Sequence, residues 1–149
     1  MSLQLRATSE LVATAWLKTV VGDRVATTLP KDSASWAEFG FVTLVNAGGT
    51  PNMYVPLRDP ATGVDCWAVN PDSQKPPWEK AAMLAEAIAA ACQDHAAIPQ
   101  TLALPTGYPA AQVKSAYLTG EPRRVPNDPS SYAHYMIPGL VIAWTEVAS

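Results

Sequence analysis

Residues 64–93 read VDCWAVNPDSQKPPWEKAAMLAEAIAAACQ and hold the two clearest secondary-structure patterns of the chain. The alternation over Val64–Val69 is typical of a strand. Lys75–Glu79 predicts a helix entrance, because proline is tolerated in a first helical turn, where the backbone N–H has no intrahelical partner. The helix should end near Asp94-His95, before Pro99. Its predicted apolar face consists of Trp78, Ala81, Ala82, Ala85, Ile88, Ala89 and Cys92. Its predicted solvent-facing side, the wet face, consists of Glu79, Glu86 and Gln93.

An earlier helix is predicted to begin at Thr8-Ser9-Glu10 and to end at Gly22. Ser9 can cap the free backbone N–H groups of its first turn, and Glu10 places negative charge at the positive end of the helix dipole. Trp16 lies on the apolar side of this helix. We therefore expect Trp16 to dock the helix onto a sheet.

Five more segments have strand patterns, and the order of all elements indicates the fold class. Phe41–Val45 is apolar on both alternating sets, so it predicts a central strand buried on two sides, and a turn at residues 46–50 should follow it. The other four segments are Met53–Leu57 (an edge strand, given Pro56), Thr101–Leu104, Gln112–Leu118 and Leu140–Thr145. The order of helix, strands, helix, strands shows no regular βαβ alternation. We predict an α+β fold in which two main helices flank a mainly antiparallel sheet, in one domain over residues 1–149.

The composition favours a globular protein that assembles with other chains. Of 149 residues, 48% are hydrophobic and only 15% are charged, against about 25% charged in average globular chains. A soluble protein with so few charges needs either an uncharged polar surface or partners that cover it, and Lys, Glu and Asp are depleted at interface cores. Both explanations stay open. The net charge of −3, with ten scattered basic residues, argues against a general nucleic-acid binder, and no run is apolar enough to span a membrane.

No set of residues predicts a catalytic or metal site. His95 and His134 have no ligand partner at a useful spacing, and the sequence contains neither a nucleophile elbow nor a phosphate-binding loop. Asp65 and Asp94 are possible acid–base partners, but nothing in the sequence places them together. Cys66 and Cys92, 26 positions apart, are interpreted as two buried reduced thiols rather than a disulfide. We therefore expect no enzyme activity and no cofactor.

Three clusters carry interaction hypotheses. Arg58-Asp59 follows a predicted strand and is either a solvated charge pair or a contact site. Arg123 and Arg124 follow Pro122 and precede Pro126 and Pro129, so two fork-shaped donors suited to carboxylates lie on a stiff segment; the alternative is a plain surface charge run. Residues 132–135, Tyr-Ala-His-Tyr, carry aromatic rings with polar tips, which occur both at interfaces and at strand ends.

Several segments together resemble the tail terminator proteins of long-tailed (siphovirus) actinobacterial phages. The similarity runs in the same order over most of the chain, and no single segment is diagnostic. The segments are residues 7–12 (ATSELV), 16–18 (WLK), 53–58 (MYVPLR), 64–70 (VDCWAVN), 75–78 (KPPW), 84–86 (LAE), 121–125 (EPRRV) and Tyr132.

The resemblance implies a structural virion protein rather than an enzyme. Tail terminators form a hexameric ring that caps the growing tail tube, stops its elongation and joins it to the head–tail connector. The implied fold is a small α+β unit. The implied partners are further copies of the chain, the tail tube protein and the head–tail connector proteins, with neither sequence-specific nucleic acid nor membrane. The implied location is the tail–head junction of a virion assembled in the host cytoplasm. No catalytic residue set comes with the family, so only Arg58, Arg123 and Arg124 are assigned candidate contacts with a subunit or the tail tube.

Two stretches depart from the family pattern. Residues 59–63 (DPATG) place turn residues where a strand should continue, and residues 136–139 (MIPG) interrupt the final strand. One alternative function is another neck component, a head-completion or adaptor protein. A second is a small-molecule enzyme with an unrecognised site, which a deep polar pocket containing His134 or Asp65 would favour. For the core, at least two of Trp16, Trp67 and Trp78 should be mostly buried between helices and sheet.

Overall fold

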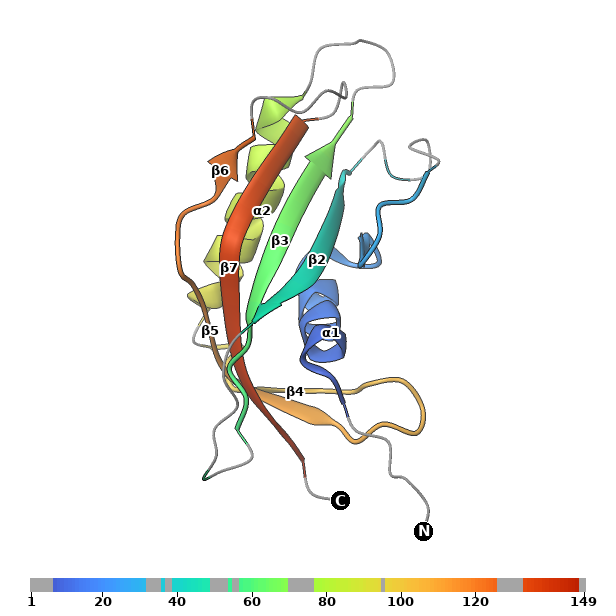
Figure 1. Cartoon of the computed structure of the whole chain (residues 1–149), viewed down its shortest axis with the longest axis vertical. Helices are drawn as coiled ribbons and strands as arrows, with labels where there is room; N and C mark the ends of the chain where they lie inside the picture. The colour runs from blue at the N-terminus through green and yellow to red at the C-terminus, as the bar shows by residue number, and fades with distance from the viewer. Residues whose placement is uncertain are drawn as a thin grey trace.

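The computed structural model describes residues 7–31, 36, 39–48, 54, 57–69, 77–94, 96–125 and 133–147. These residues form two helices and seven strands (Figure 1). The order along the chain is α1 (Ser9–Val21), β1 (Val25–Ala26), β2 (Phe41–Gly48), β3 (Ala61–Ala68), α2 (Trp78–Cys92), β4 (Gln100–Leu102), β5 (Ala111–Leu118), β6 (Arg123–Arg124) and β7 (Ala133–Glu146).

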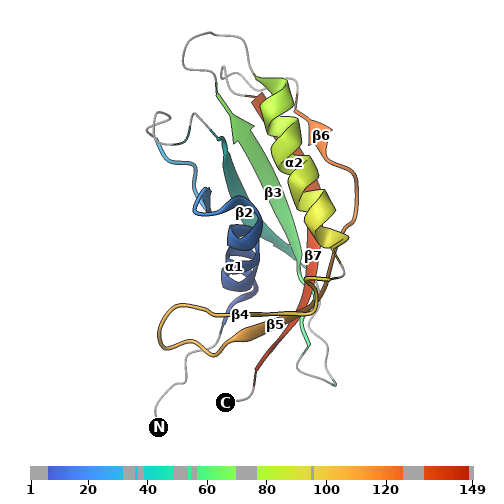
Figure 2. The ribbon, with the colours of Figure 1, turned by 180° about the vertical axis from the view of Figure 1, so that it is seen from behind.

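The strands form one sheet, and both helices lie on the same face of it (Figure 2). The strand order is β1-β2-β3-β7-β5-β4, with β6 also paired to β7. Every described pair of strands is antiparallel except β1 with β2. The β4–β5 hairpin curls across one end of the molecule, below α1 in Figure 1. The predicted α+β fold with a mainly antiparallel sheet and two main helices is confirmed.

Helix α1 ends as predicted but begins with a different cap. Thr8 is the N-cap, and its Oγ1 accepts a hydrogen bond from the Leu11 N–H at 3.1 Å. The predicted cap, Ser9, instead accepts a hydrogen bond from the indole N–H of Trp144 at 3.2 Å. At the other end, Gly22 adopts a φ of 74°, which is natural for glycine, and its N–H donates to the Lys18 carbonyl. The Ser9 hydroxyl therefore binds Trp144 of β7 instead of capping α1.

Helix α2 confirms the predicted entrance and polar face. It begins directly after Pro77, and its wet-face residues Glu79, Glu86 and Gln93 are exposed. Its buried face is narrower than predicted, because Trp78, Ala82 and Ala89 are only partly buried. Leu84, which the predicted stripe omitted, is among the buried residues Ala81, Leu84, Ala85, Ile88 and Cys92. The small side chains of Ala81 and Ala85, both fully buried, let the helix approach the sheet closely.

The interruption expected at residues 136–139 is wrong, and the turn expected over residues 59–63 is shorter than predicted. Strand β3 already begins at Ala61, so the expected turn over residues 59–63 is confined to its first two positions. Strand β7 runs without a break through Pro138 and Gly139. Val64 pairs with Ile137 and Thr62 pairs with Leu140. Between these two pairs, β7 has two residues, Pro138 and Gly139, where β3 has only Gly63. A bulge of this kind accommodates a proline, which has no N–H to give to the ladder.

The burial of Phe41, Val42, Thr43 and Leu44 on β2 agrees with the predicted two-sided strand. The strand continues through Asn46 to Gly48, where a turn was expected, and Val45 is 58% exposed. The later strands largely follow the predicted segments, with β4 starting and ending slightly earlier than expected. The predicted strand Met53–Leu57 lies mostly outside the described residues, and its two described members, Tyr54 and Leu57, are in no strand.

The main core lies between the helices and the sheet. Trp16 is 2% exposed there, as predicted, and Trp144 of β7 is equally buried beside it. Trp78, at the start of α2, is partly buried beside Tyr135 against three alanines from different elements, Ala68 of β3, Ala81 of α2 and Ala133 of β7. Trp67, in contrast, points to the sheet face opposite the helices, because β3 buries its even-numbered residues. Two of the three predicted tryptophans therefore pack at the helix–sheet layer, whereas Trp36 and Trp144 were not anticipated as core.

Candidate functional site

Strand β6 separates the two arginines that the sequence places together. Arg123 pairs with Met136 and Arg124 with Tyr135, so their side chains leave opposite faces of the sheet. The Arg124 guanidinium lies 4.3 Å from the centre of the Trp78 ring, and Trp78 meets Tyr135 edge to face at 6.4 Å. Both arginines are exposed. Arg124 therefore has an intramolecular partner on α2, whereas Arg123 faces the side of the sheet without helices.

Arg58 lies far from this pair. Its backbone exchanges two hydrogen bonds with Trp144, at 2.8 and 2.7 Å, and its guanidinium lies 5.4 Å from the Trp144 ring. Arg124 pairs with Tyr135, nine positions earlier on β7. At about 3.3 Å per residue, the two pairing points are about 30 Å apart. The structure thus does not gather Arg58, Arg123 and Arg124 into one site.

A carboxylate–imidazole pair that the sequence did not reveal lies on the sheet face opposite the helices. His134 Nε2 and Asp65 Oδ1 are 2.7 Å apart, although the residues are 69 positions apart in the chain. Trp67 stacks on the His134 ring at 4.0 Å, and its indole N–H donates to the Thr43 hydroxyl at 3.0 Å. The only sequence signal was the alternation of β3, because the pairing depends on the register of β3 against β7.

A deep polar pocket containing His134 or Asp65 would favour the enzyme alternative. Neither residue lines the two grooves described below. Within the described part of the chain, no group of three or more His, Cys, Asp and Glu side chains is placed to hold a metal ion. Asp94 instead accepts a hydrogen bond from the Ala96 N–H at the end of α2, and His95 lies outside the described residues. Asp65 and Trp67 of β3 thus contact His134 of β7 through a hydrogen bond and ring stacking, and these contacts join the two strands.

The two cysteines are free, buried thiols, as predicted. Burial, with a smaller contribution from the charge of Asp65, raises the pKa of Cys66 to about 12. Burial raises the pKa of Cys92 to about 11. The thiolate is the nucleophilic and metal-binding form, so neither side chain is activated near neutral pH.

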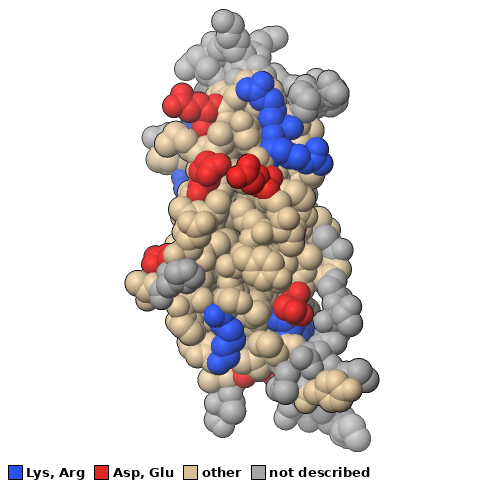
Figure 3. Space-filling view, turned by 90° about the vertical axis from the view of Figure 1, so that its left-hand side faces the viewer, with Lys and Arg blue, Asp and Glu red and all other residues tan. Residues whose placement is uncertain are grey.

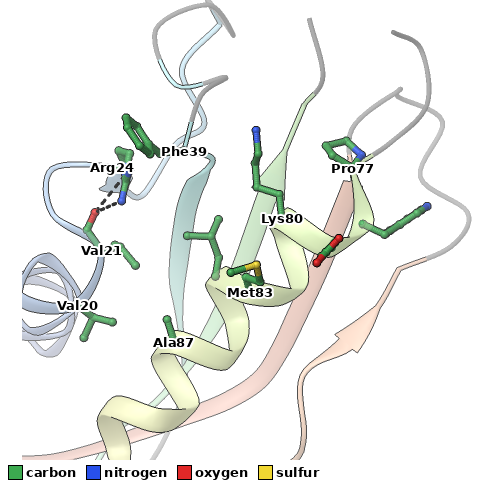
Figure 4. A pocket seen from close by; sticks show the side chains of 11 residues that line it. Val20, Val21, Arg24, Phe39, Pro77, Lys80, Met83 and Ala87 are labelled. Carbon is green, nitrogen blue, oxygen red and sulfur yellow. Dashed lines mark hydrogen bonds between the residues drawn. The ribbon is translucent and has the colours of Figure 1, made fainter. Parts of the chain in front are cut away.

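An apolar groove of about 700 Å³ separates the end of α1 from the first half of α2 (Figure 4). We call it the α1–α2 groove. Its exposed large apolar side chains are Phe39 (56% exposed) and Met83 (66% exposed). Arg24 is fixed at its edge, because its guanidinium donates twice to the Val21 carbonyl and lies 4.7 Å from the Phe39 ring centre. The charged lining residues are Arg24, Lys80 and Glu79.

A second groove, of about 570 Å³, lies on the other flank of α2, against the end of β5 and the segment that leads to β6. We call it the α2–β5 groove. Its charged lining residues are Glu86 and Glu121, and it includes Tyr117, which is 54% exposed. Figure 3 views this side of the molecule and shows acidic groups beside a broad uncharged surface, with basic groups above them and at the lower end of that surface. The two flanks of α2 thus differ in the sign of their charge.

Comparisons with known proteins identify no family. No protein-family model matches the chain, and no curated protein sequence matches it. One solved chain, from a structure titled "Virion of native gene transfer agent (GTA) particle", aligns with 93% of this chain and 90% of its own length, at 17% sequence identity and a TM-score of 0.47. Similarity at this level assigns neither fold nor function. In the described residues, no helix is long and apolar enough to cross a membrane.

Proposed function

We propose that this chain is a structural virion protein, the tail terminator of a long-tailed phage. In this proposal, six copies close into a ring that caps the tail tube, stops its elongation and presents a surface to the head–tail connector. The protein performs no chemistry, and its function lies in the surfaces it offers to other chains. The resemblance of ordered sequence segments suggests this class of assembly.

The observation that carries the proposal is the pair of grooves on the two flanks of α2. Phe39 and Met83 are more than half exposed and line the same hollow, so they form a patch rather than scattered surface residues. Tyr117 is similarly exposed on the other flank. A chain with 15% charged residues that keeps apolar side chains exposed on two different sides is suited to contacts on both. Rings of more than two copies use two different surfaces per copy.

The proposed mechanism of length control is geometric. A ring whose symmetry matches that of the tube covers the terminal layer of tube subunits, so the next layer has no surface on which to add. The opposite side of the ring then meets the connector. A net charge of −3 per copy suits a channel through which DNA must slide, because neutralising many phosphates would hold the DNA tightly.

Sedimentation velocity and light scattering of the purified protein test the proposal, with and without the tail tube protein encoded by the same genome. We expect a closed ring, either alone or in the presence of tubes. Electron microscopy of polymerising tube protein should show shorter tubes with a ring at one end when the protein is added. A strictly monomeric protein that neither binds tube ends nor changes tube length would overturn the proposal. Binding to connector rings instead of tube ends would indicate another neck component.

A further inference from the structure

We propose that neighbouring copies join by seating the Tyr117 side of one copy in the α1–α2 groove of the next. This inference rests on the proposed ring and deepens it, because it names the two surfaces that meet. The occupant of the groove is therefore a second copy of this chain. Three features of the two flanks support this pairing: their shape, their charge and an open strand edge.

The two flanks have complementary shapes, because one is an apolar hollow and the other carries an exposed aromatic side chain. The α1–α2 groove is a hollow lined by Phe39, Met83 and the aliphatic side chains of both helices. On the other flank, the Tyr117 ring is a large amphipathic side chain that is more than half exposed. Aromatic side chains with a polar tip are enriched at interfaces, since their ring is buried while the hydroxyl keeps a hydrogen bond. Burial of Tyr117 in the groove would cover the apolar surface on both sides.

The charges of the two flanks have opposite signs. The α1–α2 groove carries Arg24 and Lys80, with one acid, Glu79. The Tyr117 flank carries Glu86 and Glu121 in its groove. Two bases and one acid thus face two acids. Complementary charge of this kind fixes the register of an interface and disfavours contact between two identical surfaces.

The Tyr117 flank also contains an open strand edge. Strand β4 pairs only with Ala111–Val113 of β5, so no described strand lies beside Ser115–Leu118 on that side. This four-residue stretch carries no charged side chain. Natural proteins usually cover, shorten or charge an open edge, because it can pair with another chain. A neighbouring copy that covers this edge would serve the same purpose.

The contact is heterologous, and this property gives a sharp test. The variant Met83→Asp places an acid opposite the partner's acidic flank, and Tyr117→Arg places a base opposite the partner's basic groove. Each variant loses one surface and keeps the other. We expect both variants to remain monomeric, or to need at least tenfold more protein to assemble, under conditions in which the unaltered protein forms rings. An equimolar mixture should give one-to-one dimers and nothing larger, since only one intact groove can meet one intact Tyr117.

A matched control replaces Val45, which is 58% exposed on β2 and outside both grooves. Val45→Asp should assemble like the unaltered protein. Circular dichroism establishes that each variant is folded. If Met83→Asp or Tyr117→Arg fails to fold, the double variant Glu86→Lys, Glu121→Lys tests the same contact by charge at exposed positions and should also lose assembly.

The outcomes separate this inference from the proposed function. If the unaltered protein forms rings and both variants do so equally well, the named surfaces are wrong and the ring proposal stands. If both variants are monomeric but their mixture gives no dimer, the two surfaces are not partners, and the inference is overturned. If the unaltered protein is monomeric even on tubes, the proposed function and this inference fail together.

Discussion

The contrast between Arg123 and Arg124 gives the most direct test of the structure. Arg124 holds its guanidinium 4.3 Å from the Trp78 ring, whereas Arg123 leaves the opposite face of the sheet. A cation–π contact at an exposed site stabilises by about 0.5–1 kcal/mol. Arg124→Ala should therefore lower the free energy of unfolding by about that amount. In a chain of this size this corresponds to a fall in Tm of about 1–4 °C. Arg123→Ala should change stability by less than about 0.5 kcal/mol.

Urea and thermal denaturation followed by circular dichroism measure both effects, and a double-mutant cycle isolates the contact. Trp78 also packs against Tyr135, so Trp78→Ala alone will lose more than the cation–π energy. The interaction energy from Arg124→Ala, Trp78→Ala and the combined variant should be about 0.5–1 kcal/mol. An interaction energy of zero, or equal losses for Arg123→Ala and Arg124→Ala, would refute the assignment of Arg124 to Trp78.

The opposite orientations of Arg123 and Arg124 also lead to a prediction about assembly. Replacing both arginines by lysine keeps the charge but removes the planar fork that binds carboxylates bidentately. We expect the double lysine variant to fold but to give aberrant tails, with the single variant Arg123→Lys reproducing most of the defect. Arg124→Lys should assemble normally, because its side chain is engaged within its own subunit. Normal rings and tail lengths from the double variant would show that both arginines are ordinary surface residues.

Three further predictions concern the core, the thiols and nucleic acid. Ser9→Ala leaves the buried indole N–H of Trp144 without its partner and should lower the free energy of unfolding by about 1–3 kcal/mol in urea denaturation; no loss would show that this hydrogen bond contributes nothing. Above about pH 9 the unfolded chain releases both thiol protons, while the folded chain holds that of Cys92 to about pH 11 and that of Cys66 to about pH 12, so each thiol should make stability fall with rising pH by up to about 1.4 kcal/mol per unit. Cys66→Ala should remove about half of that slope between pH 9 and pH 11, and an unchanged slope would exclude Cys66 as a source. Gel-shift assays should detect no duplex DNA binding at physiological salt, and a salt-sensitive shift in the micromolar range would contradict this.

Local sequence signals were enough to predict several elements of the fold. The Pro77 entrance of α2, the Gly22 end of α1 and the alternation of β3 depend on residues within a few positions of one another, and all three are as predicted. The α+β class followed from the order of such elements. The buried thiols followed from composition and spacing.

Features that depend on strand register and on the packing of helices against the sheet could not be predicted from local patterns. The bulge at Pro138-Gly139 exists because β3 pairs with β7 on that side, which no local pattern encodes. The same register brings His134 to Asp65 across 69 positions. The opposite directions of Arg123 and Arg124 result from two residues of β6 pairing with β7, where the sequence showed only a charged pair. The two grooves lie on the flanks of α2 because of how that helix crosses the sheet, so the surfaces that matter most for the proposed assembly could not be predicted from periodicity.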